Sequence, residues 1–302
     1  MTTTASRSPS SLLQLPKPLA RFFALFPLIE HAPQPVPSKR RISGPTLWIH
    51  PPKTSNDLLS ADVECLKWQA HIALRGLTDV QVRSDVKAEG ALGGRLPNLQ
   101  TPSVLTADED GDGDGDVDGE ILPAHNIAAW IDERVGLVEG DELEGYSSVE
   151  TKDESHAWVA LLEGDVHAAL ALAQPSPSFF YTTILQLPAS GSPRPVETLL
   201  TPPPAPLTGL SSLLPPYGAR IPVNAVKMRY HDAVASLSER LGTDRWFLGS
   251  SSPTALDALA FAYLHTLLHT HDDLRIEVAK RVNLVTWERR VYEAVRGAFV
   301  PC

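Results

Sequence analysis

The sequence predicts a small α/β unit followed by an all-helical unit. A strand–helix–strand pattern covers residues 46–84, and a helix, Thr254–Leu268, is apolar on almost every side. A helix of that kind is buried at the centre of a helical domain. Helical patterns also precede and follow it, from Val223 to Ala298. These observations favour one α/β domain and one all-α domain.

The helix Thr254–Leu268 begins with a capping box. We expect Thr254 to be the N-cap residue and to accept a hydrogen bond from the amide of Asp257, whose carboxylate reaches back to the Thr254 amide. That carboxylate also lies at the positive end of the helix dipole. Losing such a cap costs about 0.5–2 kcal/mol, so both residues are predicted to have a structural role.

Composition is that of an ordinary globular protein, with 302 residues, 43% hydrophobic and 21% charged. The formal net charge is −10, and the run Asp108–Glu120 holds eight acidic residues and no basic one. Removing that run leaves −2, so the acidity belongs to one loop. Neither value indicates nucleic-acid binding.

Cysteine usage indicates a reducing compartment, and the hydropathy pattern predicts no membrane-spanning helix. The two cysteines are Cys65, in a predicted helix, and Cys302, at the last position. They do not form the pattern of a disulfide framework. No uninterrupted apolar run reaches the roughly 18 residues that a membrane-spanning helix needs. If the protein works at a membrane, we expect it to bind something there.

Residues 1–44 are interpreted as a flexible N-terminal extension. Its basic composition before Glu30 would suit a mitochondrial presequence, but Pro16 and Pro18 interrupt any amphipathic helix. An aromatic cluster follows, and a solvated tail does not need one. We therefore predict docking of this cluster on the protein itself or on a partner, through Phe22, Phe23, Phe26 and Leu28.

The first strand is expected at Thr46–His50, and Pro51-Pro52 end it. Ser60 or Asp57 can cap the next helix, which runs to Arg75 and ends at Gly76 in a left-handed C-cap. A second strand is expected over residues 79–84, where apolar residues alternate. A crossover helix between two strands makes the pair parallel.

The acidic loop, residues 107–120, is interpreted as a solvated insertion in a hairpin, in which the negative charges repel one another. Counted from Asp110, acids fall at positions 1, 3 and 5 and a glycine at position 6, which suits a calcium loop. However, position 12 is Ile121 rather than glutamate, and no helix pattern flanks the loop. The return strand is expected at Glu120–Leu122, and a helix after Pro123.

Residues 140–302 are expected to be helical apart from a Pro-rich segment, residues 174–222. The clearest helices after that segment are Val223–Leu241, Thr254–Leu268, Leu274–Arg281 and Leu284–Ala298.

Three stretches carry a resemblance to a known family: Cys65–Gln69, Leu96–Thr101 and Trp246–Leu268. They resemble metaxins, the subunits on the cytosolic face of the mitochondrial sorting and assembly machinery (SAM complex). More distantly, the chain resembles glutathione transferases. The resemblance implies a thioredoxin-like domain at residues 45–139 and a glutathione-transferase-like helical domain at 140–302. It also implies a cis proline at Pro97, with Pro102 as the alternative.

Transferase chemistry is not predicted. Active glutathione transferases need a Tyr, Ser or Cys just after the first strand, and an acid–Ser pair that opens the third helix of the first domain. Here the first position is His50-Pro51-Pro52, with Ser55 as the only conventional candidate, and the second is Pro123-Ala124-His125. We therefore assign no catalytic residue and no cofactor.

Two further side-chain groups are interpreted as structural. His265 and His269 have the i, i+4 spacing of a metal site, with His271 nearby, but such a pair at a helix end more often interacts with the helix's own carbonyls. We predict no metal ligand there. Cys65, inside a packed helix, is expected to be an inert core residue.

The resemblance implies a non-enzymatic receptor subunit that helps to receive β-barrel precursors at the mitochondrial outer membrane. The implied partners are the membrane-embedded β-barrel subunit, a sister metaxin and the precursors themselves. Attachment would be peripheral, on the cytosolic face, as in the smaller fungal receptor subunit. The alternatives are a transferase-like enzyme with an atypical thiol site and a soluble scaffold of another assembly.

Overall fold

The structure is a computed structural model that describes residues 44–54, 57–102, 119–136, 143–173, 222–270 and 272–299. These residues all belong to one compact unit of the chain, Ile42–Cys302. The N-terminal extension with its aromatic cluster, the acidic loop up to residue 118 and the Pro-rich segment up to residue 221 lie outside the described residues. Predictions on those segments stay predictions.

The α/β part holds a mixed four-stranded sheet with strand order β2-β1-β3-β4. The strands are β1 (Thr46–Trp48), β2 (Gln81–Arg83), β3 (Asn98–Gln100) and β4 (Ile121–Pro123). β1 and β2 are parallel, as predicted, and the other two pairs are antiparallel. In the register, Leu47 lies between Val82 and Leu99, and both leucines are fully buried. The first two strands are shorter than predicted.

Helix α2 (Val63–Leu74) crosses from β1 to β2. Its N-cap is Asp62, whose carboxylate accepts from the Cys65 amide at 3.0 Å, so the predicted caps at Ser60 and Asp57 are wrong. The Ser60 hydroxyl instead donates to the carbonyl of His50 at 2.9 Å and fixes the loop after β1. Gly76 follows with a φ of 80°, the expected left-handed conformation.

Two short 3-10 turns, η1 (Ala88–Gly90) and η2 (Leu92–Gly94), lead into β3. The Leu96–Pro97 peptide bond before β3 is cis. After β4, helix α3 (Ala124–Val135) buries Ile127 and Ile131 and ends at Gly136.

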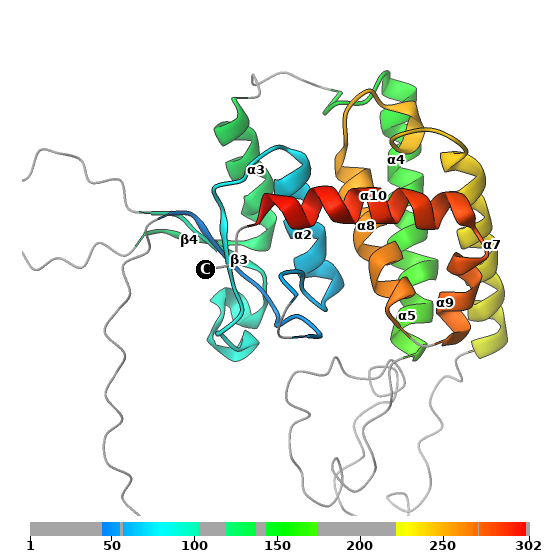
Figure 1. Cartoon of the computed structure of the whole chain (residues 1–302), viewed down its shortest axis with the longest axis horizontal. Helices are drawn as coiled ribbons and strands as arrows, with labels where there is room; N and C mark the ends of the chain where they lie inside the picture. Colours follow the sequence, from blue (N-terminus) through cyan, green and yellow to red (C-terminus); the bar gives the residue numbers. More distant parts are fainter. Residues whose placement is uncertain are drawn as a thin grey trace, which may run out of the picture. The chain divides into compact units, whose positions relative to one another are not determined.

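The helical part begins with α4 (Val149–Leu161), which continues through a π-helical segment, η3 (Leu162–Val166), into α5 (His167–Ala173). Figure 1 shows these helices beside the later ones. After the Pro-rich segment come α7 (Val223–Leu241), η6 (Phe247–Gly249), α8 (Ala255–Leu268), α9 (Asp272–Ala279) and α10 (Val282–Ala298).

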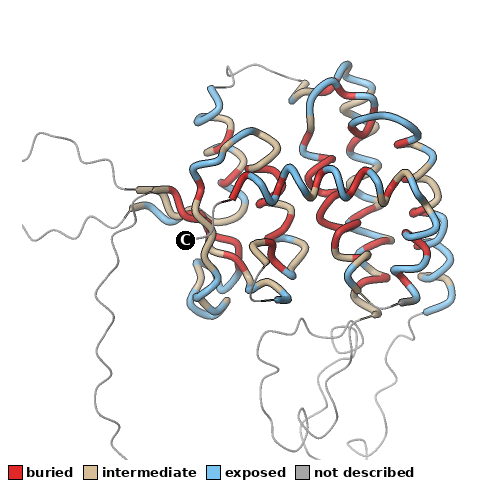
Figure 2. Tube along the Cα trace, in the orientation of Figure 1, coloured by how far each residue is buried: buried red, intermediate tan, exposed pale blue. Residues whose placement is uncertain are grey.

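Helix α8 lies at the centre of the core, as its composition predicts. It contacts α2 of the α/β part and α4, α9 and α10 of the helical part. In Figure 2 its trace is mostly coloured as buried. Packing α2 against α8 joins the two parts of the chain through one hydrophobic core. Within the described residues, no helix is both long enough and apolar enough to cross a membrane.

Candidate functional site

A cavity of about 750 Å³ opens where β1 ends, and we call it the strand-end cavity. The loop around cis-Pro97 forms one side, and the start of α3 forms another. Side chains of α2, including Lys67 and Trp68, complete it. The cavity is also lined by His50 and by the segment Pro123–His125. These are the two positions at which the sequence was compared with the active-site residues of glutathione transferases.

The segment that follows β1 and Ile49, His50-Pro51-Pro52, carries no hydroxyl group. The His50 amide donates to the sulfur of Cys65 at 3.4 Å. Cys65 is fully buried, and burial, followed by the negative charge of Asp62, raises the pKa of its thiol well above the usual range. The thiol therefore stays protonated and packs in the core, as predicted. Ser55 lies outside the described residues.

The start of α3 carries neither a carboxylate nor a hydroxyl. Pro123 is the N-cap residue and makes no side-chain cap, and Ala124 and the exposed His125 follow. The first turn also has no acidic residue. The helix N-terminus therefore contributes main-chain amides but no side chain that binds an α-amino group.

The geometry at Pro97 agrees with what the resemblance implied, and the geometry at Thr254 and Asp257 agrees with the capping box expected from the residues. The Leu96–Pro97 bond is cis, and Thr254 and Asp257 form a capping box on α8. One carboxylate oxygen of Asp257 accepts from the amide and the hydroxyl of Thr254, both at 2.8 Å, and the other accepts from the Phe247 amide at 2.8 Å. Asp257 is fully buried, and burial raises its pKa to about 6 despite these hydrogen bonds.

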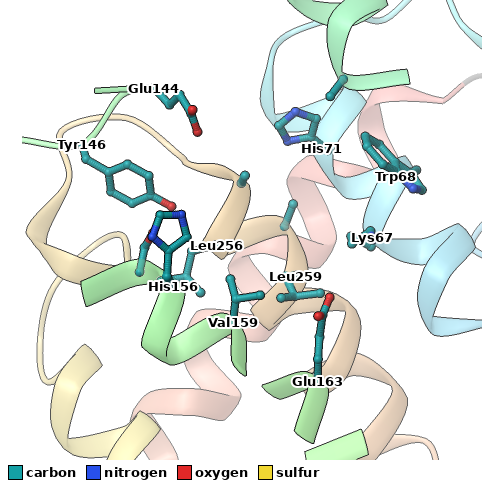
Figure 3. Close-up of a pocket in the computed structure, with 14 residues that line it drawn as sticks. Lys67, Trp68, His71, Glu144, Tyr146, His156, Val159, Glu163, Leu256 and Leu259 are labelled. Carbon is teal, nitrogen blue, oxygen red and sulfur yellow. The ribbon is translucent and has the colours of Figure 1, made fainter. Parts of the chain in front are cut away.

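A second cavity, of about 260 Å³, lies between α2, α4 and α8, and we call it the interhelical cavity. Figure 3 shows Trp68 and His71 of α2 on one side of it and Tyr146 and His156 on the other. Leu256 and Leu259 of α8 are buried at its base. It shares Lys67 and Trp68 with the strand-end cavity, so the two cavities are neighbours on α2.

His71 is one of the polar side chains that line this cavity and that the sequence analysis did not single out. It is 8% exposed, and its ring packs edge-on against the ring of Trp68, with the ring centroids 5.9 Å apart. Burial, followed by the positive charges of Arg75 and Lys67, lowers its pKa to about 4. The ring is therefore neutral at pH 7 and offers one donor and one acceptor. Its i, i+3 spacing from Trp68 on a predicted helix was the available signal.

The histidines of α8 make structural contacts. His269 Nδ1 lies 2.8 Å from the carbonyl of His265, which confirms the predicted contact with the helix's own carbonyls. His265 Nδ1 lies 2.7 Å from a carboxylate oxygen of Glu288 on α10, a pairing that the sequence did not predict. Among the described residues, no three His, Cys, Asp or Glu side chains gather as a metal site. His271 lies outside those residues.

Comparisons with known proteins extend this description. The family profile described as "Glutathione S-transferase, C-terminal domain" matches residues 230–291. No curated protein sequence gave a match.

Several solved structures are similar to the chain. Glutathione S-transferase III in its apo form is 16% identical with a TM-score of 0.45, covering 85% of this chain and 95% of that one. Glutathione transferase F7 from Populus trichocarpa is 12% identical with a TM-score of 0.45, covering 84% and 98%. Ure2p in complex with glutathione is 11% identical with a TM-score of 0.46, covering 84% and 93%.

The predicted fold class is confirmed. A small mixed sheet of four strands forms a thioredoxin-like N-terminal part, and a helical part follows that matches the C-terminal domain profile. The fold is therefore glutathione-transferase-like. A fold of this kind does not by itself determine activity.

Proposed function

We propose that the protein is a non-catalytic receptor subunit of the mitochondrial sorting and assembly machinery, bound peripherally to the cytosolic face of the outer membrane. In this role it helps to receive β-barrel precursors and contacts the membrane-embedded barrel subunit and a sister metaxin. The metaxin-like stretches Cys65–Gln69, Leu96–Thr101 and Trp246–Leu268 support this assignment. The smaller, peripheral type of receptor subunit fits the sequence best.

The observation that carries the proposal is the chemistry of the strand-end cavity. At the position of the thiolate-stabilising residue stands His50-Pro51-Pro52, and at the position of the acid–Ser pair stands Pro123-Ala124-His125. The neighbouring cysteine is a buried, protonated thiol. These residues are suited to contacts with a polypeptide rather than to activation of glutathione. Recognition of an extended segment needs exposed edges and side-chain pockets, not catalytic groups.

The proposal is tested by a pull-down from mitochondria in mild detergent with the tagged full chain. We expect recovery of the barrel-assembly subunit together with a second metaxin-like protein. Alkaline carbonate extraction in parallel should release the protein, because a peripheral subunit is held by protein contacts alone. Absence of the barrel subunit, with the protein in the cytosol, would contradict the receptor role and favour a scaffold of another assembly.

A transferase-like enzyme with an atypical thiol site is the second candidate. The strand-end cavity favours it, because a volume of about 750 Å³ and the α3 amides are compatible with a thiol peptide. Retention of the full chain on immobilised glutathione, with elution by free glutathione, would support this candidate. On the receptor proposal the protein passes through such a column.

A further inference from the structure

We propose that the outer face of α10, together with the turn before Trp246, is a docking surface for an acidic segment of a partner protein. This inference goes beyond the proposed receptor role, because it concerns a surface of the folded unit that does not depend on the assembly. We call this surface the arginine face and define it by its four exposed cations: Arg245, Arg289, Arg290 and Arg296. Its charge balance, its unpaired guanidinium groups, their support by Trp246, the type of cation and the spacing along α10 carry the proposal.

The arginine face is positive on a chain whose net charge is negative. The exposed residues of α10 and of the turn Gly242–Arg245 include the four arginines and two acids, Asp244 and Glu293, which leaves an excess of two positive charges. The other acid of α10, Glu288, is buried and pairs with His265. The whole chain carries a formal net charge of −10. A local excess of positive charge attracts a segment of opposite charge and disfavours basic partners.

Three of the four guanidinium groups have no carboxylate partner. Arg289 lies 3.6 Å from Glu293, and both side chains of that pair are mostly exposed. Within the described part of the chain, no carboxylate lies within ion-pair distance of Arg245, Arg290 or Arg296. Carboxylates form strong, charge-assisted hydrogen bonds with free guanidinium groups. An acidic segment can therefore bind these three arginines without breaking an existing ion pair.

Trp246 supports two of these side chains. It is 8% exposed, and the guanidinium carbons of Arg290 and Arg245 lie 5.5 Å and 5.7 Å from the centroid of its ring. Arg290 also donates to the carbonyl of Arg245, which accepts from the Trp287 indole as well, at 3.0 Å. These contacts restrict both arginine side chains before a partner arrives, so less conformational entropy is lost on binding.

The type of cation favours a protein partner over a lipid surface. All four cations of the arginine face are arginine, which is enriched at protein interfaces, whereas lysine is depleted there. The guanidinium group is weakly hydrated and can pair two N–H groups with the two oxygens of one carboxylate. Val282, 75% exposed at the start of α10, lies seven residues before Arg289 and therefore on the same side of the helix. It adds an apolar contact beside the charged ones.

Spacing along α10 favours a segment over a small anion. Arg289 and Arg296 lie on the same side of the helix, because seven residues make almost two turns, and their Cα atoms are about 10 Å apart along the axis. Figure 1 shows α10 crossing the other helices, and its inner side packs on α2 and α8. One small anion cannot span these positions, whereas a chain that carries several carboxylates can.

The first test titrates the full-length protein with a dye-labelled peptide of alternating Glu and Gly and follows binding by fluorescence anisotropy. Arg245→Gln with Arg296→Gln removes two unpaired cations and leaves Arg290, which contacts the main chain, in place. The matched control, Lys87→Gln with Arg229→Gln, removes two exposed cations elsewhere and changes the net charge equally. At physiological ionic strength, where distant charges are screened, we expect about tenfold weaker binding by the first variant, since two ion pairs are lost, and unchanged binding by the control, with thermal unfolding confirming that both fold. Unchanged binding by the first variant, or equal losses in the two variants, would overturn the proposal.

The identity of the occupant is tested separately. Vesicles of phosphatidylcholine that contain phosphatidylserine should sediment the unchanged protein and the variant with Arg245→Gln and Arg296→Gln to the same extent. A selective loss in that variant would assign the arginine face to the membrane and overturn the protein partner. If Asp112→Asn, Asp114→Asn and Asp116→Asn together raise the affinity for the acidic peptide several-fold, the chain's own acidic loop occupies the face and the partner assignment is wrong. The mitochondrial pull-down decides the receptor role independently of these measurements.

Discussion

The carboxylate of Asp257 accepts a hydrogen bond from the main-chain amide of Phe247 at 2.8 Å, ten residues before it in the chain. The same carboxylate caps α8 through Thr254. The buried side chain of Asp257 thus links the 3-10 turn η6 to the first turn of α8 by hydrogen bonds. The capping argument made from the sequence covers only the second of these two roles.

Because of this double role, Asp257→Ala should destabilise the protein more than Thr254→Ala does. Thr254→Ala removes one cap, at about 1 kcal/mol. Asp257→Ala leaves the buried amides of Phe247 and Thr254 without acceptors, which we expect to cost about 3 kcal/mol or more. Urea unfolding at pH 7 measures both, with Glu293→Ala, in an exposed ion pair, as the control. Equal losses for the two α8 variants would contradict the double role.

His71 should make stability depend on pH. Its folded-state pKa is about 4, below the ordinary value of 6.5, because the buried ring resists protonation. As the pH falls below 6.5, the unfolded chain takes up a proton that the folded chain does not. The contribution of the neutral His71 ring to the free energy of unfolding is therefore fully present above pH 6.5. As the pH falls toward 4 this contribution is lost, which lowers the free energy of unfolding by roughly 3 kcal/mol.

The measurement for His71 compares unfolding free energies at pH 7 and pH 4 for the unchanged protein and for His71→Phe. On going from pH 7 to pH 4, the unchanged protein should lose roughly 3 kcal/mol more of its free energy of unfolding than His71→Phe does. His156→Phe, an exposed change at the same cavity, controls for general effects of acid. An identical pH dependence for the unchanged protein and His71→Phe would show that the ring is not buried in its neutral form.

The fold was predictable from local patterns, whereas the site depended on long-range packing. The apolar run of α8, the alternation around Val80 and the position of Gly76 all act within a few residues, and each indicated the correct element. The cap of α2 was misassigned, since Asp57, Ser60 and Asp62 are all acceptable N-cap residues by type. Ser60 is engaged by the His50 carbonyl, which only the folded loop reveals.

The interhelical cavity could not be predicted for a similar reason. Its walls come from α2, α4 and α8, and the spacing of Trp68 and His71 indicates only that they share one face of α2. The residues of α8 that line the same cavity, Leu256 and Leu259, are far from this face of α2 in the sequence. Likewise, the pairing of His265 with Glu288 needs the packing of α10 on α8.

Cys65 should be unreactive in the folded protein. Its side chain is fully buried and its thiol pKa is raised, so neither access nor thiolate is available. In a Cys302→Ser background, we expect labelling by a disulfide reagent at pH 8 to be at least about a hundredfold slower in the native than in the urea-unfolded protein, because reaction requires opening of the core. Fast native labelling would reopen the case for a thiol-dependent enzyme.

The aromatic cluster of the N-terminal extension should contribute to membrane association without contributing to the core. Every described residue lies in the unit Ile42–Cys302, which begins after Phe22–Leu28. We therefore expect that deleting Phe22–Leu28 leaves the melting temperature within about 2 °C, while the fraction that sediments with mitochondrial membranes falls several-fold, as loss of an apolar anchor predicts. A deletion of equal length in the Pro-rich linker, residues 33–39, keeps the aromatic cluster and should retain membrane association. If the protein without Phe22–Leu28 sediments with membranes as fully as the unchanged chain, then attachment depends on the folded unit alone, and its docking surface must be sought on the helices and the sheet.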